Sequence, residues 1–136
     1  MKVVFDEIRL NTEKRKELVE ITKQVAGIVA GSNITNGICV VYATHTTTAV
    51  VVNENEQGLK EDIVRKIEED FPRGSGWQHD KIDDNADAHL AGAFIGPSMI
   101  IPVKGSALVL GTWQSIFTLE LDGPRSRRIL VEVLGE

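Results

Sequence analysis

The sequence predicts one domain of the α+β class, spanning residues 1–136. Three observations lead to this prediction. The chain has 136 residues, close to the commonest size of a single domain. Hydrophobic residues make up 42% and charged residues 26%, which are the shares of a globular chain with a core. Three segments carry apolar residues at helical spacing, and the segments between and after them resemble strands.

We expect the first half of the chain to form a strand, a helix and then a β-rich stretch. The strand covers residues 3–10, and Asn11-Thr12 offers a cap for a helix that ends at Gly31 in the left-handed conformation. Apolar residues recur along that helix at helical spacing: Leu18, Ile21, Val25, Ile28 and Val29. Two apolar runs follow within residues 37–52, separated by a polar insert that either continues a strand or turns a corner.

The second half is expected to add two helices and four strands. One helix runs from about Gln57 to Phe71, stopped by Pro72, and its charged residues form a solvated face. An irregular loop separates it from a helix that runs from about Asn85 to Ile95. The strands follow as a meander over residues 99–103, 107–110, 116–121 and 127–134.

Charge and cysteine content narrow the range of functions. Acidic residues outnumber basic ones by 20 to 15, a net charge of −5 that disfavours a broad nucleic-acid interface. A single cysteine excludes an internal disulfide. The N-terminus lacks the apolar region of a signal peptide, and no apolar run approaches the roughly 20 residues that span a bilayer. We therefore expect a cytoplasmic protein with neither a nucleic-acid nor a membrane partner.

Three histidines are the first candidates for chemistry. His45, His79 and His89 all fall within one 45-residue stretch. Imidazole is the commonest metal ligand in proteins, and three imidazoles with an open fourth position are typical of catalytic zinc. Their spacing matches no known ligand signature, so three unrelated surface histidines are the alternative.

The predicted third helix indicates a pocket wall beside His89. Asn85 and Gly92 lie one turn before and one turn after His89 on the same stripe, whereas Asp87 points away from it. The apolar face expected next to this stripe consists of Ala86, Leu90, Ala93 and Phe94. The alternative is a half-buried histidine whose ring bonds to the nearby backbone.

Residues around the first apolar runs offer further candidates. Glu54 is a carboxylate at a strand-to-helix junction and a candidate general base, whereas Asn55 beside it is explained by capping. His45 lies among threonines, whose hydroxyls suit strand packing and phosphate contacts equally. Cys39 is assigned to the core, because a straight strand would hold it about 20 Å from His45.

Two segments near the C-terminus carry large or charged side chains. Trp113 in Gly111-Thr112-Trp113-Gln114 either fills the core or stacks on a ligand. Arg125, Arg127 and Arg128 form a cationic turn after Gly123-Pro124. Their guanidinium groups either bind a phosphate or pair with carboxylates on neighbouring strands.

Several short strings occur in order between residues 37 and 135. They are His45-Thr46-Thr47-Thr48-Ala49 with Asn53-Glu54, Trp77-Gln78-His79, Asn85-Ala86-Asp87-Ala88-His89-Leu90, Leu110-Gly111-Thr112-Trp113-Gln114 and Asp122-Gly123-Pro124-Arg125. In these strings the chain closely resembles the YjbQ family. The most distinctive part is Leu-Gly-Thr-Trp-Gln followed by Gly-Pro-Arg.

The resemblance implies a fold, an assembly and a site. The fold is a compact α+β sandwich with a mainly antiparallel sheet core and about three helices, assembled as a homotrimer. The motif residues are expected to gather in one pocket near subunit boundaries. The implied roles are catalysis by Glu54 and His45, metal binding by His45, His79 and His89, and substrate binding by Asn53, Asn85, Thr112, Trp113, Gln114 and Arg125.

The family carries the name secondary thiamine-phosphate synthase. The implied transferase reaction joins a pyrimidine-methyl diphosphate to a thiazole phosphate and releases pyrophosphate. Magnesium, the usual partner of diphosphates, prefers oxygen ligands, whereas three imidazoles favour zinc and hydrolysis. A metal-dependent hydrolase and a non-catalytic trimeric protein that binds a phosphorylated metabolite are therefore the alternatives.

Overall fold

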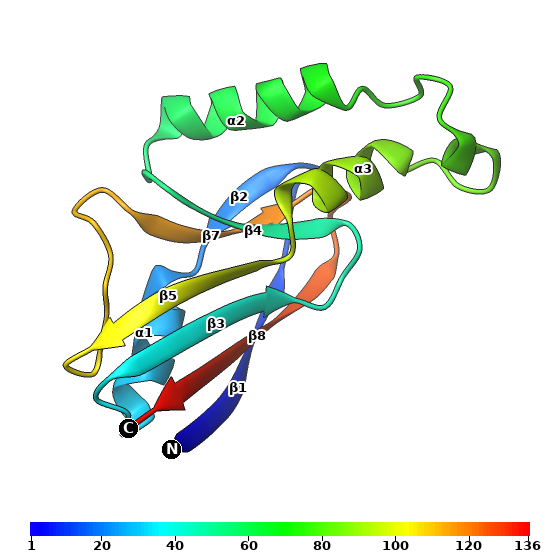
Figure 1. The fold of residues 1–136 in the computed structure, drawn as a ribbon. Coiled ribbons are helices and arrows are strands. Elements are labelled where there is room, and N and C mark those ends of the chain that lie inside the picture. Colours follow the sequence, from blue (N-terminus) through cyan, green and yellow to red (C-terminus); the bar gives the residue numbers. More distant parts are fainter.

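Two antiparallel sheets form the framework of the computed structural model, which describes residues 1–136 (Figure 1). The five-stranded sheet has the order β1-β8-β3-β5-β6 and the three-stranded sheet the order β2-β7-β4. The strands are β1 (Lys2–Asn11), β2 (Glu17–Glu20), β3 (Gly37–Ala43), β4 (Thr48–Asn53), β5 (Ser98–Lys104), β6 (Ala107–Leu108), β7 (Ser115–Glu120) and β8 (Ser126–Gly135). The helices are α1 (Thr22–Gly31), α2 (Gln57–Asp70) and α3 (Ala86–Ile95), with a short 3₁₀ turn η1 (Gln78–Lys81). The predicted α+β, mainly antiparallel sandwich is thus confirmed.

The three-stranded sheet is buried on both faces. On one side it packs against α2 and α3, which lie above it in Figure 1, through apolar residues such as Phe117 and Leu119. On the other side, Val50 and Ile116 join a larger cluster formed with α1 and the inner face of the five-stranded sheet. β7 is the central strand, and Ile116 through Leu121 are all buried. Its polar residues Thr118 and Glu120 therefore lie inside the protein.

The first helix starts later than the sequence predicted. Leu18 belongs to β2, which pairs with β7, and the helix begins at Thr22 without a side-chain cap. Thr12 is buried and bonds to Glu120 instead of capping a helix. The helical spacing of Leu18 was misleading because one apolar residue fits a short strand as well. The left-handed residue after α1 is Asn33, not Gly31.

The other two helices lie where expected, with different details. Glu56, not Asn55, caps α2, because its carboxylate accepts the N–H groups of Gly58 and Leu59. The expected apolar face of α3 is wrong in part, since Ala93 is exposed and Phe94 is 77% exposed. The buried residues of α3 are instead small ones and one ion-paired carboxylate: Ala86, Asp87, Ala88, Ala91 and Gly92.

The polar insert turns a corner between the two sheets. β3 ends at Ala43 in the five-stranded sheet, and β4 begins at Thr48 in the three-stranded one. We name residues 44–47 the histidine loop. The C-terminal strands also cross between sheets, so they do not form the simple meander predicted, because β7 pairs with β2 and β4. No helix of the chain is long and apolar enough to cross a membrane.

Candidate functional site

His45 sits at the corner between the two sheets and is fixed by the backbone of β8. Its Nε2 accepts a hydrogen bond of 3.0 Å from the backbone N–H of Arg128. A neutral imidazole that accepts at Nε2 carries its proton on Nδ1. Burial, with the nearby positive charge of Arg127, lowers the pKa of His45 and so favours this neutral form. His45 thereby has an N–H donor available at Nδ1.

A polar hollow of about 370 Å³ lies in front of the histidine loop. No hydrophobic residue lines it; the lining residues are Thr44, His45, Thr46, Thr47, Asn85, His89, Asp122, Arg125 and Arg127. Arg125 reaches it from the turn before β8, and its guanidinium lies 3.0 Å from Asp122. Asn85 donates to the same carboxylate at 2.8 Å. The structure therefore brings together four of the predicted site residues: His45, Asn85, His89 and Arg125.

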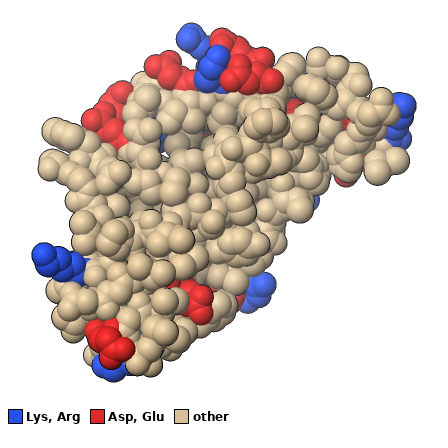
Figure 2. Space-filling view, in the orientation of Figure 1, with Lys and Arg blue, Asp and Glu red and all other residues tan.

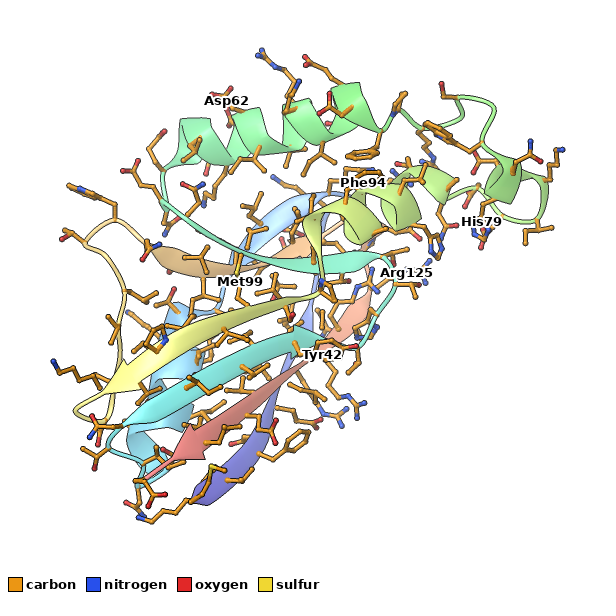
Figure 3. The ribbon with its side chains drawn as sticks, in the orientation of Figure 1. Tyr42, Asp62, His79, Phe94, Met99 and Arg125 are labelled. Atoms are coloured by element: carbon orange, nitrogen blue, oxygen red, sulfur yellow. The ribbon has the colours of Figure 1, made fainter.

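A second hollow, of about 570 Å³, shares Thr44, His45, Thr46 and His89 with the first. It is lined by Tyr42, Ala43, Thr44, His45, Thr46, Thr48, His89, Gly92, Ala93 and Pro97. A Cβ atom at Gly92 would lie 3.0 Å from the carbonyl oxygen of Thr46, so the absence of a side chain allows α3 to approach the histidine loop. Within the predicted stripe, Asn85 lines the polar hollow, Gly92 lines the second hollow and His89 lines both. Figure 3 shows Tyr42 and Arg125 at this end of the sheets.

His79 contacts the site only through His89. Their rings meet edge to face with centroids 4.6 Å apart, and His79 lies on η1, which projects beyond α3 (Figure 3). It lines neither hollow. The pKa of the nearby Asp83 carboxyl is lowered, mainly because it accepts a hydrogen bond from the backbone N–H of Asp84. The two histidine rings lower this pKa further. The Nε2 atom of His79 is buried and has no hydrogen-bond partner.

The three histidines of one chain do not fit a zinc centre. Nowhere do three or more His, Cys, Asp or Glu side chains converge as a metal ion requires. The Nε2 lone pair of His45 is already used by Arg128 N–H. Zinc therefore stays a prediction for this protein. Cys39 is buried in the core as predicted, and burial raises the pKa of its thiol to about 11.

Sequence reasoning missed Glu120, the carboxylate with which Arg127 of the cationic turn pairs beside the polar hollow. Glu120 on β7 is completely buried and pairs with Arg127, which is 4% exposed and points inward from β8. Burial alone would raise the pKa of Glu120, but hydrogen bonds from Arg127, Asp122 N–H and Thr12 outweigh it and lower the pKa. Charged residues in strands usually face water, so only the packing of both sheets reveals this pair.

A second buried carboxylate, Asp87, lies on the far side of α3 from His89. It accepts hydrogen bonds from Arg15 at 2.8 and 3.0 Å and from Lys16 at 2.6 Å. Burial opposes its charge, but these hydrogen bonds dominate and hold the pKa of Asp87 well below its usual range. Asp87 points away from His89, as the helical geometry predicted, and has a partner of its own.

The remaining predicted residues lie at the opposite end of β4. Asn53 ends this strand, five residues or about 17 Å from Thr48 beside the histidine loop, and Glu54 follows it. Asn53 pairs with Ser115, which places the loop with Thr112, Trp113 and Gln114 at the same end. We name these five residues the tryptophan group: Asn53, Glu54, Thr112, Trp113 and Gln114. Within one chain they do not share the polar hollow with the histidines.

Comparisons with known proteins agree with this architecture. The model of the family described as UPF0047 protein YjbQ-like matches residues 6–136. A UPF0047 protein of Archaeoglobus fulgidus is 48% identical over 94% of this chain and 99% of its own length. One from Methanothermobacter thermautotrophicus is 46% identical over 100% of this chain and 95% of its own. The chain belongs to the UPF0047 (YjbQ) family.

Solved structures of other YjbQ-like chains have the same fold. A YbjQ-like protein of unknown function from Sulfolobus solfataricus superposes with a TM-score of 0.98 at 52% identity, over 99% of both chains. A hypothetical protein from Aeropyrum pernix does so with a TM-score of 0.95 at 44% identity, over 98% of this chain and 99% of its own. YjbQ membership thus agrees with the fold described above.

Proposed function

We propose that this YjbQ-family chain is an enzyme that binds a small phosphorylated substrate in the polar hollow, as a secondary thiamine-phosphate synthase does. The observation that carries the proposal is the orientation of His45. Its Nε2 accepts Arg128 N–H, which leaves Nδ1–H as the free donor of a ring that lines the polar hollow together with threonines and Arg125. Hydrogen-bond donors and a guanidinium in one polar hollow suit a phosphate.

The two hollows suit the two parts of such a substrate. The phosphate groups occupy the polar hollow, where His45, Arg125 and Asn85 surround them. The heteroaromatic ring occupies the larger hollow beside Tyr42 and Pro97. In the transferase reaction, the bond from the pyrimidine's methylene carbon to the diphosphate oxygen breaks, and a bond from that carbon to the thiazole nitrogen forms. The electron pair leaves on pyrophosphate, whose growing charge the donors of the polar hollow stabilise.

A second copy of the chain supplies the tryptophan group in this proposal. Trp113 is 72% exposed and lies at the opposite end of the β4–β7 pair from His45 and His89, so one chain cannot use both groups on one small substrate. A cyclic, head-to-tail trimer brings the tryptophan group of one copy to the hollows of the next. Glu54 then reaches the site from across the subunit boundary, where its carboxylate stabilises positive charge that develops on the pyrimidine as pyrophosphate leaves.

The outer face of the five-stranded sheet supports association between copies. Register places Val3, Phe5, Tyr42 and Ile100 on this face, where they are 58%, 62%, 43% and 65% exposed. Figure 2 shows few charged side chains over most of this view, with many of them gathered over α2. An exposed apolar face of this kind is typical of an interface between subunits.

Complementation between two defective variants tests the shared site. Trp113→Ala damages one half of the site and Arg125→Ala the other. After the two chains are mixed at equal concentration, unfolded and refolded together, about a quarter of the sites in a random trimer receive both intact halves. Recovered formation of thiamine phosphate from both substrates, which needs both halves, supports a site shared between copies, and no recovery contradicts it.

Direct detection of product tests the reaction itself. The purified protein is incubated with the pyrimidine-methyl diphosphate and the thiazole phosphate, with and without added zinc, and thiamine phosphate is sought by mass spectrometry. Saturable binding without product points to a metabolite-binding protein. Phosphate release only with zinc, at about one zinc per chain by elemental analysis, points to a metal-dependent hydrolase instead.

A further inference from the structure

We propose that Glu120 and Arg127 are positioning residues of the polar hollow, because their buried ion pair fixes the histidine loop and the Arg125 turn relative to each other. The proposal rests on the proposed function in one respect, namely that this hollow binds the ligand. Neither residue was among the predicted site residues. Both are all but inaccessible to solvent, with side chains 0% and 4% exposed.

Arg127 connects the pair to the histidine loop. Its Nη2 donates to the carbonyl oxygen of Thr47 at 3.2 Å and to the hydroxyl of Thr47 at 2.9 Å. Its Nε and Nη2 also donate to the two oxygens of Glu120. The next residue, Arg128, donates its backbone N–H to His45. One guanidinium and the adjacent amide therefore determine where the loop sits and how the His45 ring is oriented.

Glu120 connects the pair to the turn that carries Arg125. Its carboxylate accepts the backbone N–H groups of Leu121 at 3.0 Å and Asp122 at 2.9 Å. It also accepts the hydroxyl of Thr12 at 2.7 Å, and the same hydroxyl oxygen accepts the backbone N–H of Arg125 at 2.9 Å. Asp122 and Arg125 both line the polar hollow. The carboxylate thus holds the start of this turn directly and its end through Thr12.

The charges of this pair suit positioning better than they suit stability alone. Apolar residues of similar volume often stabilise a core as well as a buried ion pair does. An ion pair with several directional hydrogen bonds has one orientation, which apolar packing does not impose to the same degree. Because β7 and β8 belong to different sheets, the pair also determines how the two sheets meet beside the hollow.

Substitutions that disrupt the ion pair and its hydrogen bonds, but keep most of the side-chain volume, test the proposal. Glu120→Gln removes the charge, and Arg127→Lys keeps the charge but loses the planar fork that reaches both Glu120 and Thr47. Lys16→Met is the matched control, because Lys16 is 6% exposed and pairs with Asp87 outside the hollow. Amide hydrogen exchange by NMR and pyrophosphate affinity by calorimetry are measured at a temperature where every variant is folded.

We expect both test variants to bind pyrophosphate about tenfold or more weakly, as the loss of aligned charge-assisted hydrogen bonds implies. We also expect faster exchange at Asp122 and Arg128 and unchanged exchange in the middle of β7. Lys16→Met is expected to change neither readout. If the test variants behave as the control does, the positioning role is wrong. If the wild-type protein binds no pyrophosphate, the proposed function fails, while the exchange rates still decide whether the pair fixes the loop and turn.

Discussion

The histidine end and the tryptophan end of the β4–β7 strand pair differ in how their side chains are held. At the histidine end, Glu120, Arg127 and Thr12 are buried and bonded to the loop and turn that carry the candidate site residues. At the tryptophan end, Thr112, Trp113 and Gln114 are exposed. Among these three side chains, Gln114 accepts a hydrogen bond from the backbone N–H of Gly111.

This difference indicates which parts of the site one chain completes alone. The interior of the chain fixes the geometry of the histidine end, so its donors are organised before a ligand arrives. The side chains of the tryptophan end make few stabilising contacts within one chain. This lack of contacts within one chain supports the proposal that a second copy covers them.

The largest effect is expected from breaking the buried ion pair. Arg127→Met leaves the Glu120 carboxylate buried without a cation, which costs about 3–5 kcal/mol of unfolding free energy. Urea denaturation at pH 7 measures the loss. Arg128→Met is the matched control, because Arg128 is 48% exposed and should change stability by less than about 0.5 kcal/mol. Equal losses in the two variants would show that the histidine end does not depend on its interior.

Much of the fold could be predicted because local patterns and tertiary packing agree. The helix over residues 57–70 has a continuous apolar stripe and a proline after it, so its limits were nearly correct. Leu18 could not be placed, because whether it continues a helix or pairs as a strand depends on β7, about a hundred residues away. Pairing between distant strands leaves no local trace in a sequence.

The candidate site could be predicted only where chemistry and surface position coincide. His45, His89, Asn85 and Arg125 were predicted from residue type and motif, and they line one hollow. The helical stripe on α3 also followed from spacing alone. Arg127 was predicted either to bind a phosphate or to pair with a carboxylate on a neighbouring strand, but its partner Glu120 was not predicted, because only the meeting of two sheets buries this charged strand residue. The separation of the tryptophan group required the register of β4 and β7.

The next effect is a loss of stability in acid. Glu120 and Asp87 have lowered pKa values in the folded protein, so the unfolded chain binds more protons as the pH falls below about 4.5. The stability they contribute is present above that pH and is lost towards their folded pKa values. His45 adds a smaller loss that begins below about 6.5, because its folded pKa is also lowered. We expect a decrease of about 2 kcal/mol or more between pH 7 and pH 3.

Urea titrations at several pH values measure this decrease. In Arg127→Met the acid-dependent part from Glu120 should reverse, because a buried carboxylate without a cation has a raised pKa and gains from protonation. The variant should therefore show a flatter dependence on pH than the wild-type protein. A dependence on pH as steep as that of the wild type would mean that Arg127 does not lower the pKa of Glu120.

A smaller effect, on affinity alone, is expected at Arg125. Its guanidinium is 54% exposed and lines the polar hollow, so Arg125→Ala should weaken pyrophosphate binding about tenfold with little change in unfolding free energy. Arg73→Ala is the control, since Arg73 is 52% exposed and pairs with Asp84 outside the hollow. Isothermal calorimetry compares the two. A similar loss for both variants would point to general attraction between charges and not to a specific phosphate contact.

The smallest effect on stability is expected at Trp113, and it sharpens the comparison most directly. Because the indole is 72% exposed, Trp113→Ala should change the unfolding free energy of the separate chain by less than about 0.5 kcal/mol. If a second copy covers the indole, the same variant should shift association toward the monomer, as analytical ultracentrifugation over a range of concentrations would show. Phe94→Ala is the control for exposed aromatic rings, because Phe94 is 77% exposed and packs on Phe71 of its own chain. A Trp113 variant that associates as the wild type does, while the Phe94 variant does not, would move the subunit boundary from the tryptophan end to α3.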